Sequence, residues 1–94
     1  MPVTVVVPSV LAAVSGGRTA FEVPDAAAAS VREALDAVAR DYPVLVRRIR
    51  DERGELRRHV NVYVRGGDVR RGAGLATAVA AGEEVLVIQS IAGG

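Results

Sequence analysis

The 94 residues suffice for one small domain and leave little room for a deep active site beside its core. Twelve basic and eleven acidic side chains give a formal charge of +1, which does not favour binding to nucleic acid or to an anionic membrane. The chain has no Cys and its twelve basic residues are all Arg, which excludes disulfides, thiol nucleophiles and lysine Schiff bases. No apolar run approaches a membrane span and the N-terminus lacks a signal peptide, so we expect a soluble, cytoplasmic protein.

Two expected strands, joined by a glycine turn, open the chain. Residues 2–7 are rich in β-branched residues and apolar on both faces, which indicates an inner strand, and residues 10–14 continue it irregularly. Residues 15–17 predict a hairpin turn, because Gly reaches positive φ without steric cost. Residues 18–23 then return as the second strand.

The strongest helix signal in the chain comes next. Ser30 and Glu33 have the spacing of a capping box, with Ser30 as the N-cap. Pro43 predicts an end near Tyr42. A single apolar stripe recurs at helical spacing and comprises Val31, Leu35, Val38 and Tyr42.

Residues 44–58 are the least regular part of the sequence, and we expect a solvated loop with one or two apolar anchors. Leu45, Val46 and Ile49 could anchor a short helical turn. The segment is crowded with arginines, namely Arg47, Arg48, Arg50, Arg53, Arg57 and Arg58. Interleaved acidic residues and the lack of aromatic residues argue against binding of single-stranded nucleic acid. A solvated face is the first interpretation of this cluster, and a docking patch for an acidic partner is the second.

The last third of the chain predicts further strands. Residues 60–65 alternate between apolar and polar side chains, as in a half-buried strand. Residues 66–68 predict a turn, residues 69–71 a short edge strand, and residues 72–81 a loop. Residues 84–90 form the last strand, which is as apolar as the first.

This order of elements predicts an α+β fold. The first and last strands are the most apolar, so both should be central, and placing them side by side and parallel gives a mixed sheet of four or five strands packed on one main helix. That arrangement is the β-grasp, or ubiquitin-like, fold. A ferredoxin-like sandwich would need a second long helix. We expect one domain over residues 1–90 and a flexible tail over residues 91–94.

Side-chain chemistry is sparse. His59 is the single His, and nothing around it resembles a catalytic triad. The adjacent carboxylates Asp51–Glu52 and Glu83–Glu84 are interpreted as solvated turns, and no metal-ligand spacing is present. The glycine pairs at residues 66–67 and 72–74 lack the strand-to-helix context of a phosphate-binding loop.

The tail offers the one place where chemistry can be attached. Two final glycines have no Cβ, so a partner could thread Ile91, Ala92 and Gly93 through a narrow channel and present the Gly94 carboxylate to ATP. Attack on the α-phosphate would give an acyl-adenylate, from which a thiol or persulfide could displace AMP. Frayed glycine termini are common, so the argument depends on the glycines following the central strand of a β-grasp.

The sequence resembles the ubiquitin-like sulfur carriers, which include the small subunit of molybdopterin synthase and the thiamin sulfur carrier. It is most similar to the actinobacterial branch that serves cysteine biosynthesis, and the resemblance covers essentially the whole chain. The segments that carry it are 30–35, 41–43, 58–64, 68–70, 74–78, 81–85 and 91–94.

The resemblance implies a protein co-substrate that is not itself an enzyme and binds no cofactor. A ubiquitin-activating-type enzyme would use ATP to adenylate Gly94, and persulfide sulfur would convert it to a thiocarboxylate. In the cysteine branch, a pyridoxal-phosphate cysteine synthase and a JAMM-type zinc protease would follow. The molybdopterin and thiamin pathways remain alternatives, as do a ubiquitin-like modifier of lysines and a β-grasp interaction module with an inert tail.

A docking surface is expected on the sheet face turned away from the helix, because the tail leaves the sheet there. Strand alternation places polar candidates on that face, and the turn before the last strand adds two carboxylates. The expected docking residues are Asn61, Tyr63, Arg65, Glu83 and Glu84.

Overall fold

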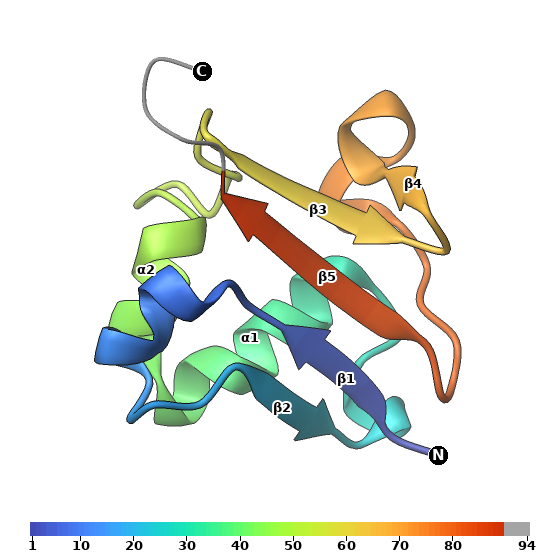
Figure 1. Cartoon of the computed structure of the whole chain (residues 1–94). Coiled ribbons are helices and arrows are strands. Elements are labelled where there is room, and N and C mark those ends of the chain that lie inside the picture. The colour runs from blue at the N-terminus through green and yellow to red at the C-terminus, as the bar shows by residue number, and fades with distance from the viewer. Residues whose placement is uncertain (90–94) are drawn as a thin grey trace.

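The computed structural model describes residues 1–89, which form one mixed sheet with its helices on one face (Figure 1). The strands are β1 (Val3–Val6), β2 (Ala20–Val23), β3 (Val60–Val64), β4 (Gly67–Asp68) and β5 (Glu84–Gln89). The helices are α1 (Val31–Asp41) and α2 (Pro43–Ile49), with 3-10 turns η1 (Ser9–Val14), η2 (Asp25–Ala27), η3 (Val69–Arg71) and η4 (Gly74–Ala76).

The sheet has the strand order β2-β1-β5-β3-β4, with β5 at its centre. Strand β5 pairs parallel with β1 and antiparallel with β3, and the other neighbouring strands are antiparallel. The predicted parallel pairing of the first and last strands is therefore confirmed. Parallel neighbours need a long crossover, and here the segment that carries α1 supplies part of it.

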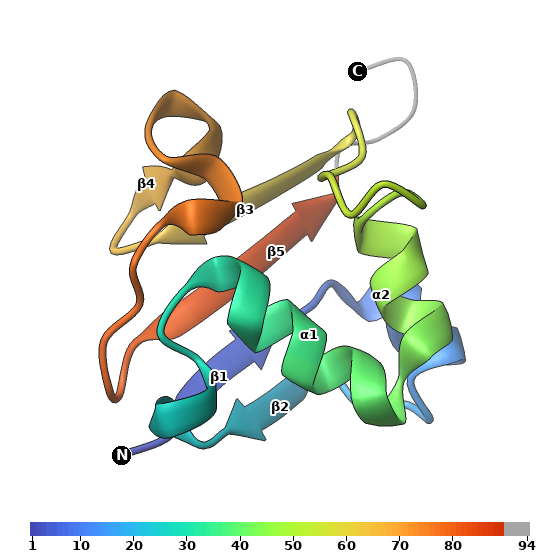
Figure 2. The ribbon, with the colours of Figure 1, turned by 180° about the vertical axis from the view of Figure 1, so that it is seen from behind.

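Helix α1 lies across one face of the sheet, as the view from behind shows (Figure 2). Val31, Leu35 and Val38 of the predicted stripe are buried, while Tyr42 is half-buried with its ring 4.9 Å from that of Phe21. They meet the inward valines of the strands, among which Val3, Val5, Val60, Val62, Val85 and Val87 are almost completely buried. The core is aliphatic, and the β-grasp arrangement expected from the sequence is confirmed.

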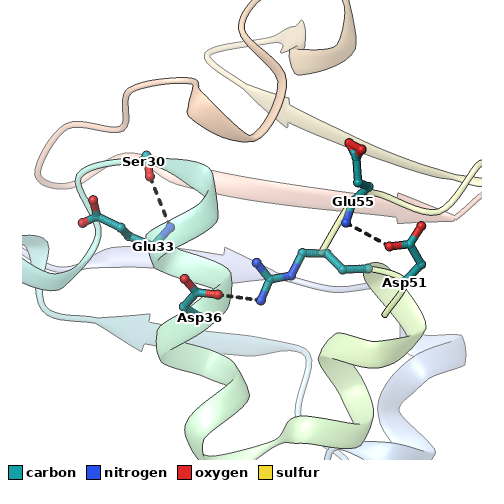
Figure 3. Close-up of polar contacts among 6 residues, drawn as sticks. Ser30, Glu33, Asp36, Asp51 and Glu55 are labelled. Carbon is teal, nitrogen blue, oxygen red and sulfur yellow. Dashed lines mark hydrogen bonds and ion pairs between the residues drawn. The ribbon is translucent and has the colours of Figure 1, made fainter. Parts of the chain in front are cut away.

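The start of α1 is fixed by its own side chains. The Ser30 Oγ accepts a hydrogen bond of 3.2 Å from the Glu33 N–H, as Figure 3 shows. The Glu33 carboxylate reaches back to the N–H of Ala29, one residue before the expected position. The first bond satisfies an N–H group that the first turn of a helix leaves without a partner, and the second holds the residue that precedes the cap.

Replacing Ser30 by Ala should therefore lower the free energy of unfolding by about 1 kcal/mol, because the cap is lost while α1 keeps its packing. Urea denaturation monitored by circular dichroism measures this change. Ser9→Ala is the matched control, since Ser9 is exposed and begins the 3-10 turn η1, which has no side-chain cap. Equal midpoints for the two variants would contradict the capping role.

Two local expectations were wrong. Residues 10–14, expected to extend the first strand, belong to the 3-10 turn η1. The short edge strand is β4 at Gly67–Asp68, and residues 69–71, where it was expected, form the turn η3. Val69 is buried in η3 and so helps to close the core at that edge of the sheet. In η1, only Leu11 is buried, while Val10 is 66% exposed.

The loop expected over residues 44–58 begins with a real helix. Pro43 does not simply end α1; it occupies the first position of α2, where its fixed φ suits a helix start. Leu45, Val46 and Ile49 are all buried, so three apolar side chains anchor this helix and not one or two. An ion pair of 2.7 Å between Asp36 of α1 and Arg50 ties the two helices together (Figure 3). Neither α1 nor α2 is long and apolar enough to cross a membrane.

Candidate functional site

Strand β5 leads directly to the predicted reactive tail. Ile91, Ala92, Gly93 and Gly94 lie outside the described residues, and Gln89 is the last residue before the undescribed stretch. Val85 and Val87 are buried between the sheet and α1, and neighbouring strands pair with β5 on both sides. The point at which the tail begins is therefore fixed by the most central strand of the fold.

The sheet face opposite the helices is open and largely uncharged. The register places Val6, Leu86 and Tyr63 side by side on β1, β5 and β3, and each is half-buried. Ile88 lies opposite Asn61 and is 40% exposed, which is unusual for a large apolar side chain. We call Val6, Tyr63, Leu86 and Ile88 the outer-face patch. Leu86 and Ile88 were missed from the sequence, although their alternation with buried Val85 and Val87 is visible there.

Four of the five predicted docking residues lie together at one end of this face. Tyr63, Arg65, Glu83 and Glu84 line a shallow hollow of about 260 Å³ with Leu86 and Gly66. Arg65 and Glu83 form an ion pair, and the Glu83 carboxylate also accepts from the Ala80 N–H at 2.7 Å. These two side chains thus hold the turn before β5.

Asn61, the fifth predicted docking residue, is set apart from the hollow. Its Oδ1 accepts a hydrogen bond of 2.8 Å from Arg70, so it joins β3 to the turn η3. Within residues 1–89, no group of three or more His, Asp or Glu side chains is placed to hold a metal ion. His59 precedes β3 and is exposed, as the sequence predicts. The described part of the chain therefore offers surfaces for contact.

A family model described as the ThiS family matches residues 6–94. The chain belongs to the ThiS family. It is 36% identical over 96 aligned residues to the sulfur carrier protein CysO of Mycobacterium tuberculosis, with all of both chains covered. It is 39% identical over 84 residues to small archaeal modifier protein 1 of Haloferax volcanii, which covers 89% of this chain and 91% of that protein.

Solved structures agree with this assignment to the ThiS family. A chain in the crystal structure of the Amycolatopsis orientalis BexX/CysO complex has a TM-score of 0.85 and 34% identity, covering 98% of this chain and 99% of its own. The crystal structure of Mycobacterium tuberculosis CysO has a TM-score of 0.81 and 32% identity, covering 95% of this chain and 99% of its own. The predicted membership of the ubiquitin-like sulfur carriers is confirmed, and with it the β-grasp fold.

The turn between β3 and β4 in this ThiS-family chain is tight and strained. Val64 pairs with Gly67, so Arg65 and Gly66 form a two-residue loop, and both have positive φ, 53° and 78°. Such a loop follows the twist of the two strands, but it places a non-glycine residue in the left-handed region. Arg65 is the residue that adopts this unfavourable backbone conformation. Its guanidinium donates hydrogen bonds to the Glu83 carboxylate and to the Ala78 carbonyl. Gly66 is therefore a turn glycine, as predicted, whereas Gly67, also expected in the turn, begins β4.

We expect Gly66→Ala to lower the free energy of unfolding by about 1–2 kcal/mol, since the added Cβ disfavours the left-handed conformation. The neighbouring Gly67→Ala is the matched control: its φ is ordinary, and its Cβ would meet only the Val64 carbonyl oxygen at 3.7 Å. Urea denaturation of both variants measures the difference. A Gly67 variant as unstable as the Gly66 variant would contradict the conformational explanation.

Asp51 and Glu52 belong to a turn, as the sequence predicts. One Asp51 oxygen accepts from the N–H groups of Glu55 and Arg53, at 3.1 and 2.9 Å, while Glu52 is exposed. The hydrogen bond from Glu55 lowers the pKa of Asp51 below its usual 3.8. Because the folded state favours the charged form, this stabilisation is present at neutral pH and is lost as the pH falls through the lowered pKa.

Proposed function

We propose that this chain is a sulfur carrier whose reactive group is the α-carboxylate of Gly94. The carboxylate attacks the α-phosphorus of ATP on a ubiquitin-activating-type enzyme, and pyrophosphate leaves. The terminal sulfur of a persulfide then attacks the carbonyl carbon of the acyl-adenylate and displaces AMP. A thiol reduces the resulting acyl disulfide and leaves a thiocarboxylate. Full-length similarity to the sulfur carrier protein CysO, through residue 94, is the observation that supports this proposal.

The outer-face patch is the proposed docking surface for the activating enzyme. It is uncharged, lies on the face that α1 leaves open, and includes Leu86 and Ile88 on the strand that leads to the tail. A partner seated there would receive the tail at a defined position and need not search for it. The solved BexX/CysO complex shows that a relative of this chain forms a complex with another protein.

Cysteine biosynthesis is the proposed destination of the sulfur. In that pathway, a pyridoxal-phosphate synthase transfers the thiocarboxylate sulfur to activated serine, and a JAMM-type zinc protease frees cysteine from the tail. Donation to molybdopterin or thiamin is the runner-up. The intermediates differ in mass, because only the cysteine route leaves a cysteinyl group on the carrier.

Intact-mass measurement tests the proposal. The chain is incubated with its activating enzyme, ATP and hydrosulfide, and the expected product carries one sulfur in place of one oxygen. Adding the synthase and activated serine should then convert it to the cysteinyl adduct. A chain whose mass stays unchanged when ATP and enzyme are present would contradict the carrier function.

A role as a protein modifier is the second candidate, because a relative at 39% identity is a small archaeal modifier protein. The same activated carboxylate would then react with a lysine of another protein. Since this sequence contains no Lys, copies cannot be joined to one another through lysine side chains. The modifier hypothesis therefore predicts single copies of the chain joined to lysines of other proteins, and the absence of any such conjugate in native cells would contradict it.

A further inference from the structure

A second feature lies at the base of the tail. An open hollow of about 560 Å³ is bounded by Gln89 at the end of β5, and we call it the basic groove. The rest of its wall comes from η1, α2 and the segment before β3, namely Leu11, Val44, Arg47, Arg48, Arg57 and His59. Figure 1 shows η1, α2 and the start of β3 at the same end of the sheet as the end of β5.

The arginines of the basic groove are held in place by the fold. Buried Leu45 and Ile49 anchor α2 and so position Arg47 and Arg48 in its last turn. Arg57 comes from a different segment and is joined to the same helix end by two hydrogen bonds. Its Nε donates to the Arg47 carbonyl at 2.7 Å, and its backbone N–H donates to the Ile49 carbonyl at 3.0 Å. Arg47 and Arg48 are neighbours in the sequence, and packing brings the third positive charge, that of Arg57, to the same surface.

No carboxylate within residues 1–89 forms an ion pair with these arginines, although, besides the hydrogen bond from Glu55, the charge of Arg57 contributes to the lowered pKa of Asp51. The ion pairs found there join Arg50 to Asp36 and Arg65 to Glu83, and neither includes an arginine of the groove. The acidic residues interleaved in the sequence lie elsewhere. Asp51 and Glu52 line a separate hollow between α1 and α2, where Arg47 is also found, and Glu55 lines a third beside Leu75.

Helix electrostatics explains part of this arrangement. Arg47 and Arg48 lie in the last turn of α2, where positive charge is favourable. That effect does not explain why Arg57 is tied to the same helix end, nor why the apolar Val44, 41% exposed, lies beside them. Arginine next to accessible apolar surface is typical of the centres of protein interfaces.

We propose that the basic groove docks an acidic segment of the enzyme that processes the tail. The inference rests on the proposed function, because that function requires an enzyme to bind around Gln89 and the residues after it. Asp and Glu side chains of the partner would pair with Arg47, Arg48 and Arg57 at the mouth of the channel that receives the tail. The groove would then set the direction in which the tail enters, while the outer-face patch supplies apolar contact.

The test compares the chain with an Arg47→Glu/Arg48→Glu variant. Calorimetry without ATP measures binding to the activating enzyme, and intact mass measures thiocarboxylate formation with ATP and hydrosulfide. We expect the Kd and the KM for the carrier to rise about tenfold, with kcat and the KM for ATP unchanged. Arg32→Glu/Arg71→Glu is the matched control, since it changes the net charge equally and lies outside the groove. Urea midpoints establish that both variants fold.

Several results would overturn the proposal. An unchanged Kd, or an equal loss in the control variant, would remove the groove as a docking site. A raised KM for ATP alone would indicate that the groove holds the nucleotide phosphates instead. A lowered KM for the carrier would indicate that the groove binds this chain's own terminal carboxylate. If charge reversal prevents folding, Arg47→Gln/Arg48→Gln must give the same rise in Kd, and an unchanged value overturns the proposal.

Failure of the proposed function gives a different result. If the unaltered chain binds the enzyme through Arg47 and Arg48 but gains no sulfur, the docking role of the groove is supported and the carrier function is contradicted. A chain that does not bind the enzyme at all overturns both.

Discussion

A chain shortened by Gly94 alone should form no detectable thiocarboxylate, although it should fold as stably as the full chain. The proposed reactive group belongs to the main chain, so the deletion leaves a carboxylate but moves it back by about 3.5 Å. Displacements of about 1 Å at a reacting atom can cost about 100-fold in rate, so the loss should exceed that factor. Intact mass after incubation with the activating enzyme, ATP and hydrosulfide measures it.

Two further variants test whether the position of the terminal carboxylate or the identity of the last residue matters. Adding one Ala after Gly94 should also abolish sulfur transfer, because the carboxylate then overshoots the ATP by a similar distance. Gly94→Ala keeps the carboxylate at its original position along the chain and adds only a Cβ. It should therefore keep more activity than the shortened chain or the chain lengthened by one Ala. All three should bind the activating enzyme without ATP, since the outer-face patch and the basic groove are unchanged. Full activity in the shortened chain would show that Gly94 is not the reactive end.

The overall fold could be predicted because its central signals are local. The first and last strands are apolar on both faces, which is enough to make them inner neighbours, and their parallel pairing then follows. Helix α1 is indicated in the sequence by the capping residues Ser30 and Glu33 and by one apolar stripe. Each signal lies within a dozen residues, so no knowledge of tertiary contacts was needed.

Helix α2 could not be predicted with the same certainty because tertiary contacts stabilise it. Seven residues are too few for a stable helix in water. The sequence there shows a proline, which can end a helix, and arginines interleaved with acidic residues, which is typical of a solvated segment. What decides the outcome is the burial of Leu45, Val46 and Ile49, and this depends on the space left beside α1 and η1. The short helix therefore exists because the rest of the fold needs its apolar face.

The candidate site was predictable in part for a similar reason. The tail is a feature of sequence alone, and alternation along β3 placed Asn61 and Tyr63 on the open face. The arginine cluster had two interpretations from the sequence, a solvated face first and a docking patch second, because its arginines alternate with acids along the chain. In the fold, Asp51 is held in its own turn and lines a hollow other than the basic groove, although Arg47 lines both. Interleaving in sequence is thus a poor guide to the charge of a surface.

Ile49→Ala should lower the free energy of unfolding by about 2–5 kcal/mol, as much as Leu35→Ala in the main helix. Both side chains are fully buried, so each truncation removes apolar contact and leaves a cavity. If residues 44–58 were the solvated loop that the sequence favours, the Ile49 variant would lose almost nothing. Urea denaturation of both variants decides between these outcomes. A loss of this size would be a large share of the stability of a domain with fewer than 100 residues.

Val44→Ala provides the matched control on the same helix. Val44 is 41% exposed, so its truncation should cost far less than that of Ile49. Loss of Ile49 should loosen the helix end that carries Arg47 and Arg48, and so weaken binding to the activating enzyme even where the domain remains folded. If Ile49→Ala left both stability and binding intact, α2 would not position the basic groove.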